Sequence, residues 1–96
     1  MNEGSEGRGR QIVQSLGCVA CHSDDGTTRI GPTWQGSFGS QRTLVNGETM
    51  NIDAAYIKKS IVSPSTQIAA GFASIMPAYN LSEDELDAIV EYMKNL

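Results

Sequence analysis

The stretch Cys18-Val19-Ala20-Cys21-His22 contains both cysteines and the only histidine of this 96-residue chain. Two thiols three positions apart can each form a thioether to a vinyl group of haem, and a histidine directly after them can coordinate the iron. A zinc site would need about four ligands and would have to recruit a carboxylate such as Asp24. A redox dithiol is typical of a βαβ context. The pattern favours one covalently bound haem, with zinc and a dithiol as the alternatives.

The sixth iron ligand cannot be a second histidine, so it is a methionine, a weaker group or absent. Met1 lies in a polar lead-in and Met93 in the apolar stripe of the last predicted helix. Met50 lies in a predicted hairpin, where packing is the usual role of a methionine. Met76 lies in a long segment without periodicity, residues 65–80, and such a segment in a small domain is usually functional. We therefore expect Met76 to be the sixth ligand, with Met50 as the alternative.

A thioether ligand is soft and neutral, which favours ferrous iron and raises the reduction potential. If both axial positions are filled, no substrate can bind at the iron. We then expect outer-sphere electron transfer, so that the domain alone is a carrier and not an enzyme. A haem sensor or a peroxidase-like domain with an open or labile sixth position is the alternative from another functional class.

Periodicity and capping residues predict three helices, from residue 5 or 8 to 16, over 54–61 and over 83–95. Asp53 or Asn51 would cap the second helix, and Ser82 with Glu85 forms a capping box before the third. Asn46-Gly47 between β-favouring residues is a strong signal for a hairpin. Two aromatic residues and three glycines without a period predict a loop over residues 29–39 that covers an apolar feature.

Composition points to one small domain of about 40% hydrophobic residues, and a haem would enlarge its core. The net charge of −4 gives no nucleic-acid footprint. No apolar run is long enough to span a bilayer, and the N-terminal residues do not read as a signal peptide. We expect residues 1–8 to be a flexible linker and residues 9–96 to form the domain.

The ordered set of Gly9, the Cys18-x-x-Cys21-His22 motif, Gly31-Pro32, Met76-Pro77 and a terminal helix with Tyr92 resembles a class I c-type cytochrome. The resemblance implies an all-α fold, with three main helices around one covalent haem c and a small β-hairpin near Leu44–Met50. It also implies that the first and last helices cross at Gly9 and Tyr92. It further implies that the Pro32 carbonyl accepts a hydrogen bond from His22 Nδ1, while His22 and Met76 ligate the iron.

Several stretches are more narrowly similar to the cytochrome c domain fused to subunit II of some haem–copper oxidases. They are Gly17–Ser23, Gly31–Gly36, Asp53–Ile57 and Ala70–Pro77. This resemblance implies that the domain accepts electrons from a respiratory donor protein and passes them to the dinuclear copper centre of a cytochrome c oxidase. It also implies a place on the extracytoplasmic, periplasmic face of a bacterial membrane, with membrane contact only through the parent complex.

The chain has no spare cysteine or histidine for a copper centre, so we expect the copper domain to precede residue 1. The alternative is a free-standing periplasmic cytochrome, or a domain of another respiratory or dehydrogenase complex. Four side chains are candidates to donate hydrogen bonds to the haem propionates, with simple packing as their alternative role. They are Arg42, Trp34, Tyr56 and Tyr79.

Overall fold

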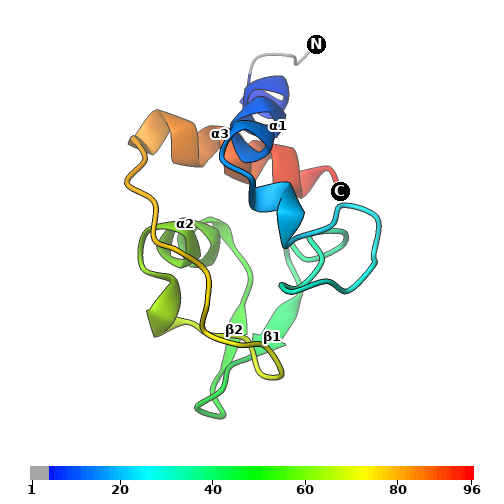
Figure 1. The fold of residues 1–96 in the computed structure, drawn as a ribbon, viewed down its shortest axis with the longest axis vertical. Helices are drawn as coiled ribbons and strands as arrows, with labels where there is room; N and C mark the ends of the chain where they lie inside the picture. The colour runs from blue at the N-terminus through cyan, green and yellow to red at the C-terminus, as the bar shows by residue number, and fades with distance from the viewer. Residues whose placement is uncertain (1–4) are drawn as a thin grey trace.

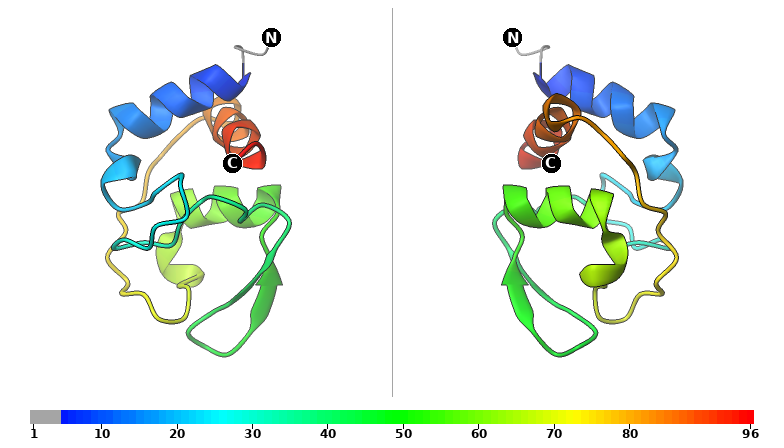
Figure 2. Two further views of the ribbon diagram at one scale, coloured as in Figure 1. Left: turned by 90° about the vertical axis from the view of Figure 1, so that its right-hand side faces the viewer. Right: turned by 90° about the vertical axis from the view of Figure 1, so that its left-hand side faces the viewer.

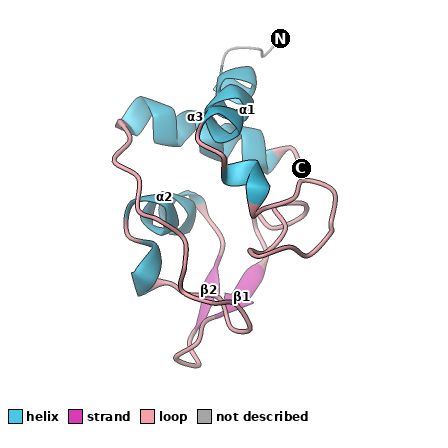
Figure 3. Ribbon diagram, viewed as in Figure 1, coloured by secondary structure: helices cyan, strands magenta, loops and turns pink. Residues whose placement is uncertain are grey.

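The computed structural model describes residues 5–96, which form three helices and one small antiparallel hairpin (Figure 1; by element type in Figure 3). In chain order the elements are α1 (Ser5–Ser15), the 3₁₀ turn η1 (Cys18–Ala20), β1 (Gln41–Thr43), β2 (Thr49–Asn51), α2 (Ala54–Val62), the 3₁₀ turn η2 (Pro64–Thr66) and α3 (Glu83–Lys94). The expected helical domain with one hairpin is confirmed. Within residues 5–96, no helix is long and apolar enough to cross a membrane.

Helices α1 and α3 cross at one end of the domain (Figure 1). A Cβ atom on Gly9 would lie 2.7 Å from the carbonyl carbon of Ala88 and 2.9 Å from the Cβ of Tyr92. Neither distance is compatible with a side chain at position 9, so glycine is what allows the two backbones to approach. The expected crossing at Gly9 and Tyr92 is confirmed.

Helices α2 and α3 begin at the capping residues that the sequence indicates. The Asp53 carboxylate accepts a hydrogen bond from the Tyr56 N–H at 2.8 Å. The Ser82 hydroxyl accepts from the Glu85 N–H at 3.2 Å, and the Glu85 carboxylate accepts from the Ser82 N–H at 2.9 Å. These bonds satisfy N–H groups that have no partner inside the helix, which fixes both helix starts.

One group of ion pairs joins α2 to α3. The Lys58 ammonium contacts the carboxylates of Asp87 and Glu83, and hydrogen bonds to these two side chains raise the pKa of Lys58. The group is exposed, so its contribution to stability is small. The face of α2 that is turned inward carries the buried Tyr56 and Ile57.

The hairpin expected near Leu44–Met50 is present. Gln41 pairs with Asn51 and Thr43 with Thr49, so the hairpin extends over residues 41–51 and includes the expected range. A two-residue Asn-Gly turn of type I′ needs a positive φ at both residues. Only Gly47 has one, at 90°, because every non-glycine residue in the described part has a negative φ. The Asn46-Gly47 signal correctly located the reversal.

Two irregular segments, residues 22–40 and 65–80, complete the domain below the crossing of α1 and α3 (Figure 2). The Ala70 N–H donates to the Thr43 carbonyl at 2.9 Å, and the Tyr79 N–H donates to the Ile61 carbonyl at 2.9 Å. The second segment thus passes along β1 and α2 before it enters α3. The buried core comprises Val13, Trp34, Leu44, Ile52, Tyr56, Ile57, Ile89, Val90, Tyr92 and Met93.

The start of the domain also differs from the linker that we expected over residues 1–8. Helix α1 begins at Ser5, so residues 5–8 are helical, and residues 1–4 lie outside the described part of the chain. Glu6 lies in the first turn, where a negative charge is favourable near the positive end of the helix dipole.

Candidate functional site

A cavity of about 190 Å³ lies between α2, η1 and the two irregular segments. Apolar side chains such as Val13, Ile57 and Phe72 form much of its lining, which is usual for a cofactor site. All five predicted site residues line this cavity, from three distant parts of the chain. They are Cys18, Cys21, His22, Pro32 and Met76.

The two thiols are delivered by the turn that follows α1. Gly17 has a φ of 79°, which reverses the chain after the helix, and η1 then carries Cys18. The N–H groups of Cys21 and His22 both donate to the Cys18 carbonyl, at 3.2 and 3.0 Å. Both cysteines are half-buried and are not joined in a disulfide. Burial raises the pKa of the Cys18 thiol.

The His22 imidazole is held by the Gly31-Pro32 pair. The Nδ1–H of His22 donates to the Pro32 carbonyl at 2.8 Å, as the resemblance implied, which leaves Nε2 as the free coordinating atom. A Cβ on Gly31 would lie 2.6 Å from Cε1 of the imidazole, so the backbone of Gly31 packs directly against the ring. Burial lowers the pKa of His22, which keeps the imidazole neutral and able to bind a metal.

The indole of Trp34 has a contact that the sequence did not reveal. Its ring lies parallel to the His22 imidazole, with 5.2 Å between the centroids and 16° between the planes. The ring of Tyr92 is nearly perpendicular to the same indole, with 6.1 Å between the centroids and 83° between the planes. We expected Trp34 to pack or to donate to a propionate, and no sequence signal indicates that it stacks on the histidine of the motif.

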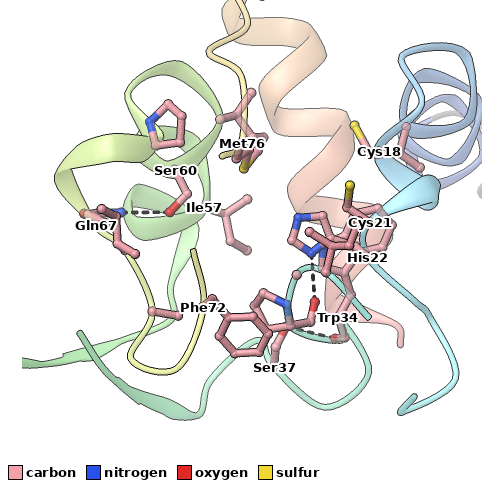
Figure 4. Close-up of a pocket in the computed structure, with 18 of the residues that line it drawn as sticks. Cys18, Cys21, His22, Trp34, Ser37, Ile57, Ser60, Gln67, Phe72 and Met76 are labelled. Carbon is pink, nitrogen blue, oxygen red and sulfur yellow. Dashed lines mark hydrogen bonds between the residues drawn. The ribbon is translucent and has the colours of Figure 1, made fainter. Parts of the chain in front are cut away.

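Met76 faces the thiols and His22 from the opposite side of the cavity. Figure 4 shows its sulfur pointing into the space, with Cys18, Cys21 and His22 across from it. Met50 packs at the edge of the core and is absent from the cavity lining. Met93 reaches the cavity but belongs to the buried core face of α3. Met1 lies outside the described residues.

A polar pair on the Met76 side was also missed by sequence reasoning. The Gln67 Nε2 donates to the Tyr56 carbonyl at 3.0 Å and to the Ser60 hydroxyl at 2.9 Å (Figure 4). Gln67 is buried and Ser60 half-buried, and both line the cavity. These bonds satisfy the amide group of Gln67, which would otherwise be costly to bury.

The four propionate candidates all line the cavity, but they are used differently. The hydroxyl of Tyr79 donates to the Leu16 carbonyl at 3.4 Å, and Tyr56 belongs to the core. Arg42 is half-buried and forms no ion pair with any residue in the range 5–96. Its positive charge contributes to the lowered pKa of His22 after burial, so it lies in the electrostatic environment of the site.

The arrangement fits a haem better than its two rivals. Within residues 5–96, no three side chains from His, Cys, Asp and Glu come together as a metal-binding group, which argues against zinc. The strands form an antiparallel hairpin, so the βαβ context of a redox dithiol is absent from this part of the chain. An apolar cavity with two adjacent thiols, one free imidazole nitrogen and an opposing thioether matches the donor set of a covalently attached haem.

Comparison with known proteins gives the same assignment. The chain is 32% identical over 91 residues to cytochrome c oxidase subunit 2 of Alkalihalophilus pseudofirmus, which covers 93% of this chain but spans only 25% of that protein. The fold is similar to that of cytochrome cH from Methylobacterium extorquens, with a TM-score of 0.68, 23% identity, and coverage of 97% of this chain and 100% of that one.

The profile of the cytochrome c family, described as "Cytochrome c", matches residues 7–96, which is nearly the whole chain. That match begins inside α1 and includes the motif, the cavity and α3. The chain therefore belongs to the cytochrome c family.

Proposed function

We propose that this domain transfers single electrons from a respiratory donor protein to the dinuclear copper centre of a terminal cytochrome c oxidase, with His22 and Met76 as the axial ligands. Its membership of the cytochrome c family and its Cys18-x-x-Cys21 pair mean that it binds one haem c covalently and acts as an electron carrier. The bound haem supplies a reversible one-electron change at iron. The observation that carries the ligand assignment is the position of Met76 opposite His22 across one cavity.

Each residue of the site has a distinct part in this function. His22 offers Nε2 to the iron because the Pro32 carbonyl retains the proton on Nδ1. Met76 offers a neutral thioether from the other side, which favours the reduced state. If His22 and Met76 both hold the haem iron, small substrates would be excluded from it. Arg42 is our candidate for an ion pair with a haem propionate, because it lines the cavity without an acidic partner in the described part of the chain.

The proposed electron port, called the port patch below, comprises three exposed apolar side chains from segments that border the cavity, Val19, Ile30 and Ile75. They are 37%, 57% and 62% exposed, and Ile30 and Ile75 also line the cavity. They come from η1 and from each of the two irregular segments. Exposed apolar side chains beside a cofactor cavity suit a docking surface. We propose that the donor protein docks on this port patch.

The oxidase context rests on the similarity to cytochrome c oxidase subunit 2. The single histidine and both cysteines are committed to the haem site, so a dinuclear copper centre would have to be built by another part of a longer protein or by another subunit. In this proposed context the domain would lie on the extracytoplasmic face of a bacterial membrane. The test is to mix the reduced domain with a copper-loaded subunit II domain and to follow haem oxidation by stopped flow. Oxidation no faster than with an unrelated copper protein would exclude this partner.

The ligand assignment is tested with Met76→Ala. We expect haem to stay covalently attached, the reduction potential to fall, and the sulfur-to-iron charge-transfer band of the ferric protein to vanish. Added cyanide should then bind ferric iron more tightly. Met50→Ala is the matched control, because Met50 does not line the cavity and should leave the band in place. An unchanged ferric spectrum in the Met76 variant would remove Met76 from the site.

A further inference from the structure

Three groups contact the His22 imidazole: the indole of Trp34, the backbone of Gly31 and the carbonyl of Pro32. Its ring is nearly parallel to the imidazole, at 5.2 Å and 16°. The Gly31 backbone packs against another part of the imidazole, and the Pro32 carbonyl accepts from Nδ1 at 2.8 Å. The hydrogen bond alone fixes one atom of the imidazole, whereas a stacked ring also restricts rotation of its plane.

The Trp34 ring is itself held in place by hydrogen bonds of its backbone and by a contact of its side chain. The Trp34 N–H donates to the Ser23 carbonyl at 2.9 Å. The Trp34 carbonyl accepts from the Ser37 N–H at 3.1 Å and from the Ser37 hydroxyl at 2.8 Å. The ring of Tyr92 packs nearly perpendicular to the indole, and only 9% of Trp34 is exposed. A ring fixed in this way can impose its orientation on its neighbour.

Stacking against an indole has an electrostatic consequence as well as a steric one. The face of an aromatic ring carries the negative part of its quadrupole and attracts positive charge. An imidazole bound to ferric iron carries more positive character than one bound to ferrous iron. A stacked indole therefore stabilises the oxidised state more than the reduced state, and it lowers the reduction potential.

We infer that Trp34 is a positioning residue for the proposed axial ligand His22: its stacked indole fixes the plane of the imidazole and lowers the reduction potential of the domain. The inference rests on the proposed function, since it takes His22 to be an iron ligand. The effect of Trp34 on the reduction potential is opposite to that of Met76, whose thioether raises the potential. The two sides of the cavity thus tune the potential in opposite directions.

Trp34 is the only tryptophan of the chain, which permits a test without a change in side-chain shape. Fluorinated tryptophans supplied during expression would replace this indole alone, and each added fluorine weakens the negative face of the ring. We expect the reduction potential of the holoprotein to rise stepwise with the number of fluorines. A potential that is independent of fluorination, or that falls with it, would overturn the electrostatic part of the inference.

The orienting part is tested with Trp34→Leu and Trp34→Phe. The first removes the aromatic ring, while the second keeps a smaller ring that can still stack. We expect the potential to rise in both variants, more in the leucine variant. The proton NMR spectrum of the ferric protein provides a second measurement, because the spread of the hyperfine-shifted haem methyl signals reports on the orientation of the iron ligands. We expect this spread to change in the leucine variant and to be partly restored in the phenylalanine variant.

Phe72→Leu is the matched control, since Phe72 is an aromatic residue of the same cavity lining that forms no ring pair with His22. If it changes the methyl spread as much as Trp34→Leu does, Trp34 merely fills space and the inference is wrong. The absorption spectra separate this failure from failure of the proposed function. A charge-transfer band that persists in every variant shows that the axial ligands are intact, whereas its absence in the unmodified holoprotein would contradict the proposed ligation itself.

Discussion

The wall of the cavity that carries His22 and the wall that carries Met76 face each other, yet they are held by different means. On the His22 side, the Gly31 N–H donates to the Cys21 carbonyl at 2.8 Å, and the imidazole is bonded to Pro32 and stacked on Trp34. On the other side, residues 73–78 form no backbone hydrogen bond to the part of the chain that the structure describes.

The segment that carries Met76 is instead held at its two ends. The Phe72 N–H donates to the Ala69 carbonyl at 3.1 Å, and the Tyr79 N–H donates to the Ile61 carbonyl at 2.9 Å. Local opening is easiest where few buried contacts and few hydrogen bonds resist it. The comparison indicates that folding itself fixes one proposed ligand, whereas the other lies on a segment that can open while the rest of the domain stays folded.

The largest effect on stability is expected for Gly31→Ala, on the cavity wall that carries His22. The added Cβ would lie 2.6 Å from Cε1 of His22, so the imidazole or the backbone must move. We expect a loss of about 1–3 kcal/mol in the free energy of unfolding, as for overpacking of a core. Chemical denaturation of the holoprotein measures it. Ser74→Ala on the opposite wall is the control and should change stability by less than about 0.5 kcal/mol. Equal losses in the two variants would show that the walls are equally rigid.

Added imidazole tests whether Met76 is displaced from the iron more easily than His22. We expect it to displace Met76 from ferric iron while the fold persists, with the loss of the sulfur charge-transfer band as the measurement. Pro77→Gly increases the freedom of the open segment by about 0.4–1 kcal/mol, so imidazole should bind about two to five times more tightly. Pro64→Gly is the matched control, because the turn at Pro64 is closed by a hydrogen bond from the Gln67 N–H. If imidazole affinity rises by a similar factor in both variants, the Met76 segment is no more flexible than the turn at Pro64, and the comparison is wrong.

The smallest expected effect is a pH dependence of the free energy of unfolding, which comes from two exposed carboxylates, Asp25 and Glu85. A hydrogen bond from the Thr27 N–H holds the pKa of Asp25 below its ordinary value of 3.8, and one from the Ser82 N–H holds that of Glu85 below 4.5. Because the folded pKa lies below the unfolded one, each contribution to stability is present above these values and is lost as the pH falls through the folded pKa.

Asp25→Asn and Glu85→Gln keep an acceptor oxygen but do not titrate. In each variant the stability lost between neutral and acidic pH should therefore be smaller than in the unmodified protein, as measured by urea denaturation at several pH values. Acid sensitivity that is identical in all three proteins would show that neither carboxylate contributes.

Much of the fold could be predicted because its determinants are local. Asp53 and Ser82 bond to N–H groups three residues away, so the sequence alone specifies where α2 and α3 begin. The position of the Asn46-Gly47 reversal followed for the same reason.

The site could be predicted as a set of residues but not as an arrangement. Residue chemistry singled out Cys18, Cys21 and His22, and elimination among the methionines singled out Met76. The stack of Trp34 on His22 depends instead on backbone bonds to Ser23 and Ser37, which no spacing in the sequence encodes. The pairing of Gln67 with Ser60 likewise arises only when an irregular segment passes along α2.

The hydrogen bond from the Tyr79 hydroxyl to the Leu16 carbonyl joins residues that are 63 positions apart. It bridges the chain just before the thiols and just after Met76, so the two walls meet only when most of the chain has been brought together. A haem bound covalently at Cys18 and ligated by Met76 would close a loop of nearly the same size. In terms of chain entropy it would act as a cross-link, which stabilises a protein more when the closed loop is long. The prosthetic group would then limit the freedom of the unfolded chain as well as carry the electron.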